Sequence, residues 1–321
     1  MKKRIFSSVF IVLLIAILFV LKIFVSDYFF DAFFGIIACL AGFEMSKLLS
    51  KARLYNFQIL SVIFPVVIMG INIGFSYLAG AQSDILFVLW AILIDFAVML
   101  VTLLGAFLIQ LMRRKKVIEE MTTRGVKNIS TTKFILKKCV NTLIVFIYPA
   151  FFFLFMIFIN HMSELPLEVF ANVSVDFSIF ILLTALLIPM FADTFAMLMG
   201  SLIGGKKMCP KISPNKTISG AVGGAVWTLL LMTCVYLIFV NIVGFDFMWS
   251  SFPIWAYLIV VLFGIAVAIG GDLFESILKR RAGVSDSGRM IPGHGGMLDR
   301  IDSYIFMAPY ILLAFWIIAL C

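Results

Sequence analysis

Long apolar runs separated by short polar clusters extend along the whole chain. Most runs reach about 20 residues, the length that an α-helix needs to cross the hydrocarbon core of a bilayer. The runs are continuous rather than alternating, and lipid offers no partner for backbone groups, so helices are favoured over barrel strands. We therefore predict nine transmembrane helices, near 5–25, 29–49, 57–80, 85–112, 139–160, 177–200, 219–243, 254–274 and 303–320.

The composition supports an all-α integral membrane protein. Of the 321 residues, 63% are hydrophobic and 13% are charged, against roughly 45–50% and about 25% in soluble domains. These proportions exclude an ordinary soluble enzyme, a disordered chain and a disulfide-stapled secreted domain. The five cysteines show no C-x-x-C spacing, and we interpret them as free thiols. The first apolar run resembles a signal peptide, but no cleavage motif follows it, so we expect a first membrane helix.

The basic residues predict the orientation of the helices. If the N-terminus is cytoplasmic and the helices alternate, every Lys and Arg except Lys22 lies at an inner segment, and the outer loops carry only acidic charge. Inner loops of membrane proteins are enriched in Lys and Arg. We therefore expect a cytoplasmic N-terminus, an external C-terminus and a multi-pass protein of the cell membrane. The net charge of +8 then reflects topology, and no nucleic-acid partner is expected.

The chain divides into two parts at a basic segment. Residues 1–138 hold four predicted helices and this segment, and residues 139–321 hold five helices and most of the candidate chemistry. From Ser130 the segment resembles a capped amphipathic helix. It is interpreted either as a solvated cytoplasmic loop or as a basic surface that faces lipid headgroups.

Ionisable residues inside membrane spans are costly and are therefore candidates for function. Five stand out: Glu44, Asp95, Asp193, Asp272 and Glu275. Asp95 lies near mid-membrane and receives no role. Glu44 lies one turn from an inner end, where we expect it to pair with Lys47.

The strongest cluster lies around the last inner segment. Helical spacing places Asp272, Glu275, Ser276 and Lys279 on one face, and Asp299 and Asp302 open the last span. Between these groups runs the glycine-rich stretch Pro292–Gly296. Carboxylates suit Mg²⁺, which binds one or two of them together with phosphate oxygens, and glycines let backbone N–H groups approach a phosphate. The cluster therefore predicts phosphoryl or nucleotidyl transfer.

A second inner segment contributes similar groups, from Asp193-Thr194 through Gly204-Gly205 to Thr217. The letters G-S-L-I-G-G-K-K at 200–207 resemble a P-loop. However, Lys207 replaces the final Ser or Thr, and a membrane helix precedes the motif instead of a strand. We expect a basic, glycine-containing loop beside a carboxylate.

These residues resemble the signature of the CDP-diacylglycerol synthases, or phosphatidate cytidylyltransferases. That signature reads Ser-x-x-Lys-Arg, four residues, Lys-Asp, then Pro-Gly-His-Gly-Gly and Asp-Arg-x-Asp. The matching residues are Ser276, Lys279, Arg280, Asp286, Pro292–Gly296, Asp299, Arg300 and Asp302. Asp193-Thr194 and Ile212–Thr217 resemble a second shared block. Three serines depart from the pattern, since Ser201, Ser219 and Ser285 stand where charged residues are usual.

The resemblance implies a Mg²⁺-dependent transfer of CMP from CTP to phosphatidic acid, giving CDP-diacylglycerol and pyrophosphate for phospholipid biosynthesis at the cytoplasmic face. It also implies membrane lipids and a second copy of the chain as partners, and it leaves a second cation open. The implied metal ligands are Asp272 and Asp299, then Asp302 and Asp193. The implied catalytic residues are Lys279, Asp272, Asp299 and His294, where His294 orients a phosphate or a carboxylate more readily than it acts as an acid. The implied substrate-binding residues are Lys216, Ser213, Arg280, Gly293, Gly295, Gly296, Arg300 and Ser276.

Three alternatives stay open. One is a CTP-dependent enzyme that acts on another lipid phosphate. Another, from a different class, is a secondary transporter that uses Asp95, Asp193 and Glu44, although transporters tend to show internal repeats and none is visible here. The third is an inactive relative, which the three serines would explain.

Overall fold

The computed structural model describes residues 2–79, 85–126, 129–162, 177–241, 253–288, 290 and 295–320. Within these ranges eight helices are long and apolar enough to cross a membrane. The first helix, α1 (Lys2–Phe24), adds a shorter apolar stretch, Leu13–Phe24. The protein is therefore a mostly helical, multi-pass membrane protein, as its apolar pattern predicts.

Five spans agree closely with the predicted boundaries. They are α2 (Tyr28–Lys51), α3 (Gln58–Ala79), α4 (Ile85–Met112), α8 (Phe177–Ile203) and α9 (Ile218–Asn241).

Two helices extend beyond their apolar runs. Helix α10 covers Ile254–Arg281, and its last turn carries Lys279, Arg280 and Arg281. Helix α11 covers Leu298–Leu320 and carries Asp299 in its first turn. Basic residues at a C-terminus and acidic residues at an N-terminus stabilise the helix dipole. These polar turns are therefore helical although hydropathy alone ends the spans earlier.

The fifth span is broken in its middle. It consists of α6 (Thr131–Val145), a π-helical turn η1 (Phe146–Phe151) and α7 (Phe152–Asn160). The backbone of η1 leaves helical geometry at Tyr148, just before Pro149. Proline lacks the N–H that a continuous helix needs, which accounts for the break.

The basic segment folds into helices. Helix α5 (Arg114–Thr123) packs on the start of α6 through a small apolar cluster of Val117, Met121, Phe134 and Ile135. The predicted cap is confirmed, because the Ser130 side chain accepts a hydrogen bond from the backbone N–H of Lys133. Whether this region binds lipid headgroups stays a prediction.

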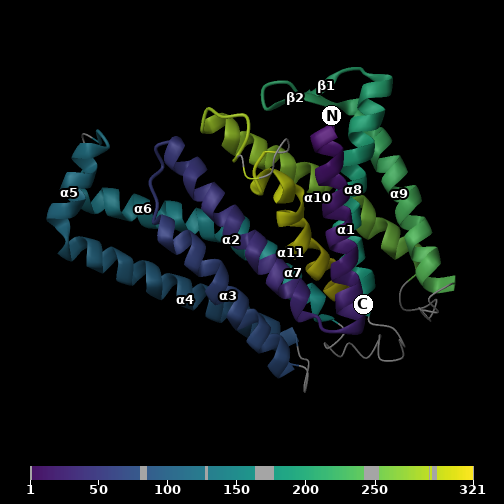
Figure 1. The fold of residues 1–321 in the computed structure, drawn as a ribbon, viewed down its shortest axis with the longest axis horizontal. Helices are drawn as coiled ribbons and strands as arrows, with labels where there is room; N and C mark the ends of the chain where they lie inside the picture. Colours follow the sequence, from purple (N-terminus) through teal and green to yellow (C-terminus); the bar gives the residue numbers. More distant parts are fainter. Residues whose placement is uncertain are drawn as a thin grey trace.

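The helices form two outer groups with a central group between them. In Figure 1, α3 to α6 lie on one side, the α8–α9 pair lies on the other, and α7, α10 and α11 lie between them. Helix α2 packs against α3, α7 and the last span α11. Residues of the N-terminal part are therefore in direct contact with the C-terminal helices.

A two-stranded ribbon that the sequence does not predict connects α8 to α9. Its strands are β1 (Lys207–Cys209) and β2 (Ser213–Thr217), antiparallel, with Lys207 opposite Thr217. Gly204 and Gly205 have φ of +68° and +110°, a backbone region open to glycine that turns the chain away from α8. In Figure 1 the ribbon lies at the same end of the molecule as the start of α1.

Candidate active site

A cavity of about 560 Å³ lies between the end of α8, the ribbon, the start of α9, the end of α10 and the start of α11. These are the helix ends that we predict to face the cytoplasm. Its polar lining combines carboxylates, basic side chains and hydroxyls, and its apolar lining comes from the spans. The lining residues are Asp193, Ala196, Met197, Gly200, Ser201, Lys207, Met208, Ser213, Asn215, Lys216, Thr217, Ala221, Ile269, Asp272, Asp299, Arg300 and Asp302.

Small residues make this corner of the fold compact. A Cβ on Gly220 would lie 2.5 Å from the carbonyl oxygen of Ala196, and one on Gly224 would lie 2.9 Å from the Ala196 nitrogen. Helices α8 and α9 therefore approach each other closely beside the cavity. This approach fixes where the ribbon begins and ends.

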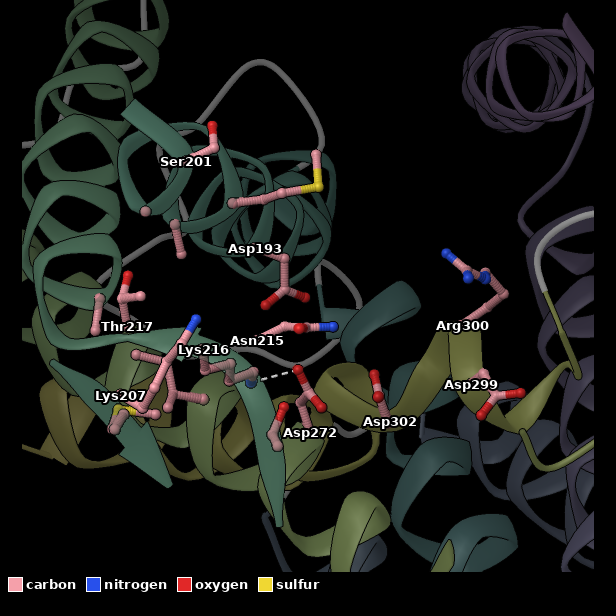
Figure 2. A pocket seen from close by; sticks show the side chains of 17 residues that line it. Asp193, Ser201, Lys207, Asn215, Lys216, Thr217, Asp272, Asp299, Arg300 and Asp302 are labelled. Atoms are coloured by element: carbon pink, nitrogen blue, oxygen red, sulfur yellow. Dashed lines mark ion pairs between the residues drawn. The ribbon is translucent and has the colours of Figure 1, made fainter. Parts of the chain in front are cut away.

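Three carboxylates from three helices face the cavity. Figure 2 shows Asp193 of α8, Asp272 of α10 and Asp302 of α11 pointing toward the same space. The Ser303 hydroxyl donates to Asp193 Oδ2 at 3.3 Å, and the Ser303 backbone N–H donates to Asp302 Oδ1 at 2.7 Å. One residue of α11 thus positions two of the three side chains.

The carboxylates share the cavity without closing into a cage. Across the part of the chain that the structure describes, no three His, Cys, Asp or Glu side chains come close enough to enclose a metal ion by themselves. Mg²⁺ does not require such a cage, because it keeps several waters and binds through one or two carboxylates plus phosphate oxygens. The oxygen-only donor set therefore fits a magnesium ion that binds together with a phosphate ligand.

Basic side chains enter the cavity from the ribbon and from α11. Lys216 of β2 forms an ion pair with Asp272, drawn as a dashed line in Figure 2. Lys207 and Arg300 also line the cavity. Arg280 is not among the lining residues, and its Nε donates to the carbonyl oxygen of Ile212 at 3.2 Å. Arg280 therefore ties α10 to the turn of the ribbon that carries Lys216.

Asp299 lies at the edge of the cavity with different partners. Its carboxylate accepts hydrogen bonds from Lys279 Nζ at 2.8 Å, the Ser287 hydroxyl at 2.9 Å, the Ser287 N–H at 3.0 Å and the Gly296 N–H at 2.7 Å. Lys279 also forms an ion pair with the fully buried Glu275. In Figure 2 the Asp299 carboxylate points away from Asp193 and Asp272. Asp299 and Lys279 thus hold the polypeptide that follows α10.

Glu44 of α2 is a site residue that sequence reasoning placed wrongly. Its carboxylate accepts a hydrogen bond from the Leu298 N–H at 2.9 Å and lies 3.2 Å from the Ser287 hydroxyl, whose single proton is shared with Asp299. The expected partner Lys47 is exposed, and its Nζ lies 4.0 Å from the centre of the Phe43 ring. The sequence does show a carboxylate inside an apolar run at Glu44. Its partners, however, lie 243 and 254 positions away in the chain, too far to be inferred from the sequence.

The remaining predicted site residues fall into two groups. Ser213, Lys216 and Arg300 line the cavity, and the Ser276 hydroxyl donates to Asp272 Oδ1 at 3.4 Å. Gly295 and Gly296 pack instead against the carboxylates of Asp299 and Glu44. Gly293 and His294 lie outside the described residues.

The three serines that depart from the family pattern differ in their surroundings. Ser201 lines the cavity. The Ser219 hydroxyl donates to the carbonyl oxygen of Gly204, which joins α9 to the end of α8. The exposed Ser285 donates to Asp286 Oδ2 at 2.8 Å. Of the three, Ser201 has the most direct access to a ligand in the cavity.

Comparison with known proteins gives consistent results. A family model described as the cytidylyltransferase family matches residues 2–318. Phosphatidate cytidylyltransferases of Staphylococcus saprophyticus, Staphylococcus haemolyticus and Staphylococcus aureus are each 44% identical to the chain over 128 residues. These alignments cover 40% of this chain and 46% of each relative, so the match spans about half the length of the curated relatives.

Proposed function

Because the chain belongs to the cytidylyltransferase family, we propose that it transfers CMP from CTP to phosphatidic acid. The products are CDP-diacylglycerol, a precursor in phospholipid biosynthesis, and pyrophosphate. One observation carries the proposal: three carboxylates from α8, α10 and α11 face the basic residues of the ribbon across one cavity at the end of the membrane helices.

The proposed chemistry needs charge neutralisation and alignment more than it needs a base. An oxygen of the lipid phosphate attacks the α-phosphorus of CTP, the new P–O bond forms, and the bond to the β-phosphate oxygen breaks. The attacking phosphate is already anionic, so positioning and electrostatic stabilisation of the leaving pyrophosphate supply most of the acceleration. Lys216, Lys207 and Arg300 line the cavity and would bind phosphate oxygens.

Magnesium is part of the proposal. Asp193, Asp272 and Asp302, whose side chains face the cavity, would hold the ion, and Asp299 lies at the edge of the same space. When bound, Mg²⁺ would neutralise negative charge on the phosphates. A second cation stays open. The cavity volume of about 560 Å³ falls in the usual range of small-molecule sites, about 300–1,000 Å³.

We also propose nine spans, with the N-terminus in the cytoplasm and the C-terminus outside. Support comes from α1 as a further apolar helix and from the placement of Lys and Arg, which follows the positive-inside pattern. The ribbon and the cavity would then face the cytoplasm, where CTP is available. A homodimer is a further expectation from the resemblance.

The test is turnover of labelled CTP by the purified protein in detergent micelles, with phosphatidic acid and with and without Mg²⁺. We expect Mg²⁺-dependent formation of a CDP-lipid, and a loss on the order of 10³-fold in Asp272→Asn because one charge of the cavity is removed. Glu119→Gln, which changes an exposed carboxylate of α5, is the matched control and should retain full activity.

The outcomes separate the alternatives. If CTP is turned over with a different lipid phosphate and not with phosphatidic acid, the acceptor is that other lipid. Absence of turnover together with absence of CTP-dependent thermal protection would contradict the proposal and favour an inactive relative.

A further inference from the structure

A buried carboxylate of the N-terminal part reaches the polypeptide that follows α10. Glu44 on α2 is 4% exposed. It accepts a hydrogen bond from the backbone N–H of Leu298, the first residue of α11, at 2.9 Å, and its Oε2 lies 3.2 Å from the Ser287 hydroxyl, whose single proton is shared with Asp299. A carboxylate at a helix N-terminus is stabilised by the unpaired N–H groups and the dipole there. Glu44 therefore holds two points of the chain in place: Leu298 at the start of α11, and Ser287 in the segment after α10.

Asp299 holds the same polypeptide from the other side. The Ser287 hydroxyl lies 2.9 Å from Asp299 Oδ2, and the N–H groups of Ser287 and Gly296 point at the same carboxylate. Ser287 thus lies between Glu44 and Asp299. The groups around both carboxylates are hydrogen-bond donors, so both carboxylates can fix the backbone.

Two glycines fit the backbone against Glu44. A Cβ on Gly288 would lie 2.2 Å from Glu44 Oε1, and one on Gly296 would lie 2.3 Å from Oε2. Neither glycine has a positive φ, so backbone conformation does not require them. What requires them is the close approach of the main chain to the carboxylate.

We propose that Glu44 is a positioning residue of the active site. Together with Asp299 it clamps Ser287 and the start of α11, and so sets the position of Asp299 and of Lys279, which binds Asp299 at 2.8 Å. Because α2 packs against α3 and α7, these two helices support the clamp. The effect on the nucleotide rests on the proposed function, whereas the clamp itself does not.

The first test measures the clamp without any activity. Hydrogen–deuterium exchange of the full chain in detergent is compared for wild type, Glu44→Gln, Glu44→Ala and the control Glu119→Gln. We expect faster exchange in peptides that cover Ser287 and Leu298, more in the Ala variant than in Gln, which keeps one acceptor oxygen. Peptides of the ribbon should not change. Unchanged exchange around Leu298 in both Glu44 variants would overturn the proposal.

The second test asks whether the clamp acts on the nucleotide. In Glu44→Ala we expect the KM for CTP to rise about tenfold, since small displacements of positioning groups have effects of this order or larger. The KM for the lipid should change less than about twofold, and Glu44→Gln should recover part of the loss. A merely structural defect would lower Vmax and leave both KM values unchanged. If wild type has no CTP turnover, the proposed function fails while the exchange experiment still decides the clamp.

The third test uses the glycine that contacts Glu44. Gly288→Ala alone forces a methyl group onto the carboxylate, and Glu44→Ala removes the obstacle. The double variant should therefore lose less activity than the product of the two single losses, as expected for residues in contact. Gly270→Ala, with nothing within 4 Å of its added Cβ, is the control and should combine independently with Glu44→Ala. Independent losses for Gly288→Ala and Glu44→Ala would contradict the contact.

Discussion

Two groups of carboxylates lie near the cavity, and their surroundings differ. Asp193 and Asp272 face the cavity, and the serine hydroxyls that donate to them lie at 3.3 and 3.4 Å. Asp272 also pairs with Lys216, and the third carboxylate of the cavity, Asp302, accepts the adjacent Ser303 N–H at 2.7 Å. Asp299 and Glu44 face the polypeptide between α10 and α11 and accept short bonds from backbone N–H groups and a hydroxyl. Carboxylates of the first kind keep oxygen lone pairs for a ligand, whereas those of the second kind use them to hold the chain.

The exposure of the ion pairs follows the same division. The side chains of Lys216 and Asp272 are 24% and 22% exposed, while those of Lys279 and Asp299 are 14% and 8% exposed. Partly exposed pairs contribute little to stability, and removing one partner of a buried pair is strongly destabilising. We therefore expect the signature to contain residues that act on the substrates, such as Asp272, and residues that stabilise the fold, such as Asp299. Substitutions should lower activity alone in the first case and stability as well in the second.

The largest expected effect on stability is that of Asp299→Asn. The substitution removes one of the two carboxylates that pair with the partly buried Lys279, the other being Glu275, and it replaces one acceptor oxygen by an NH₂ group that cannot accept the Gly296 N–H. We expect the free energy of unfolding to fall by about 3 kcal/mol, at the lower end of values for broken buried pairs. In Asp272→Asn the fall should stay below about 1 kcal/mol.

Thermal unfolding of both variants in the same detergent, without substrates, measures this difference. CTP turnover should be lost in both, so stability rather than activity separates them. Equal shifts in the midpoint temperature would remove the distinction between the two groups of carboxylates.

The predictability of these features depends on how local their causes are. Continuous apolar runs place five of the spans closely, because burial in lipid is a property of each run alone. The polar ends of α10 and α11 and the start of the fifth span at Thr131 lie outside these runs. The cluster around Asp272 follows from helical spacing, and its proximity to Asp193 follows from no local rule. The Glu44–Ser287 contact joins residues 243 positions apart and has no local signal. The ribbon was missed because Lys207–Thr217 shows no alternation of apolar and polar residues.

Lys216→Ala should show the opposite pattern to Asp299→Asn. Its ammonium is the basic group paired with Asp272, and in the proposed reaction it binds phosphate oxygens. We expect kcat/KM for CTP to fall about 100-fold, as for removal of one stabilising donor from an active site. The midpoint of thermal unfolding should change little, because the pair is partly exposed.

Steady-state kinetics at saturating lipid, combined with the unfolding measurement, tests this pattern. Lys211→Ala, which changes an exposed lysine at the turn of the ribbon, is the control. A large loss of stability in Lys216→Ala with modest kinetic change would assign Lys216 to the architecture instead.

The smallest effect is expected at Ser201, which lines the cavity at a position where the resemblance implies a basic residue. Its hydroxyl donates to the Leu198 carbonyl oxygen at 2.7 Å. This bond is local and exposed, so its loss in an Arg variant should cost little stability. Ser201→Arg adds one exposed positive charge, and an exposed charge contributes about 0.5 kcal/mol. That energy corresponds to a KM for CTP about twofold lower, with kcat unchanged.

The gain should vanish in high salt, because the Debye length falls to about 3 Å at 1 M. Ser285→Arg, on an exposed side chain that does not line the cavity, should leave KM unaltered. A rise in KM for Ser201→Arg, or equal gains at both positions, would show that charge at the cavity wall does not act on the nucleotide.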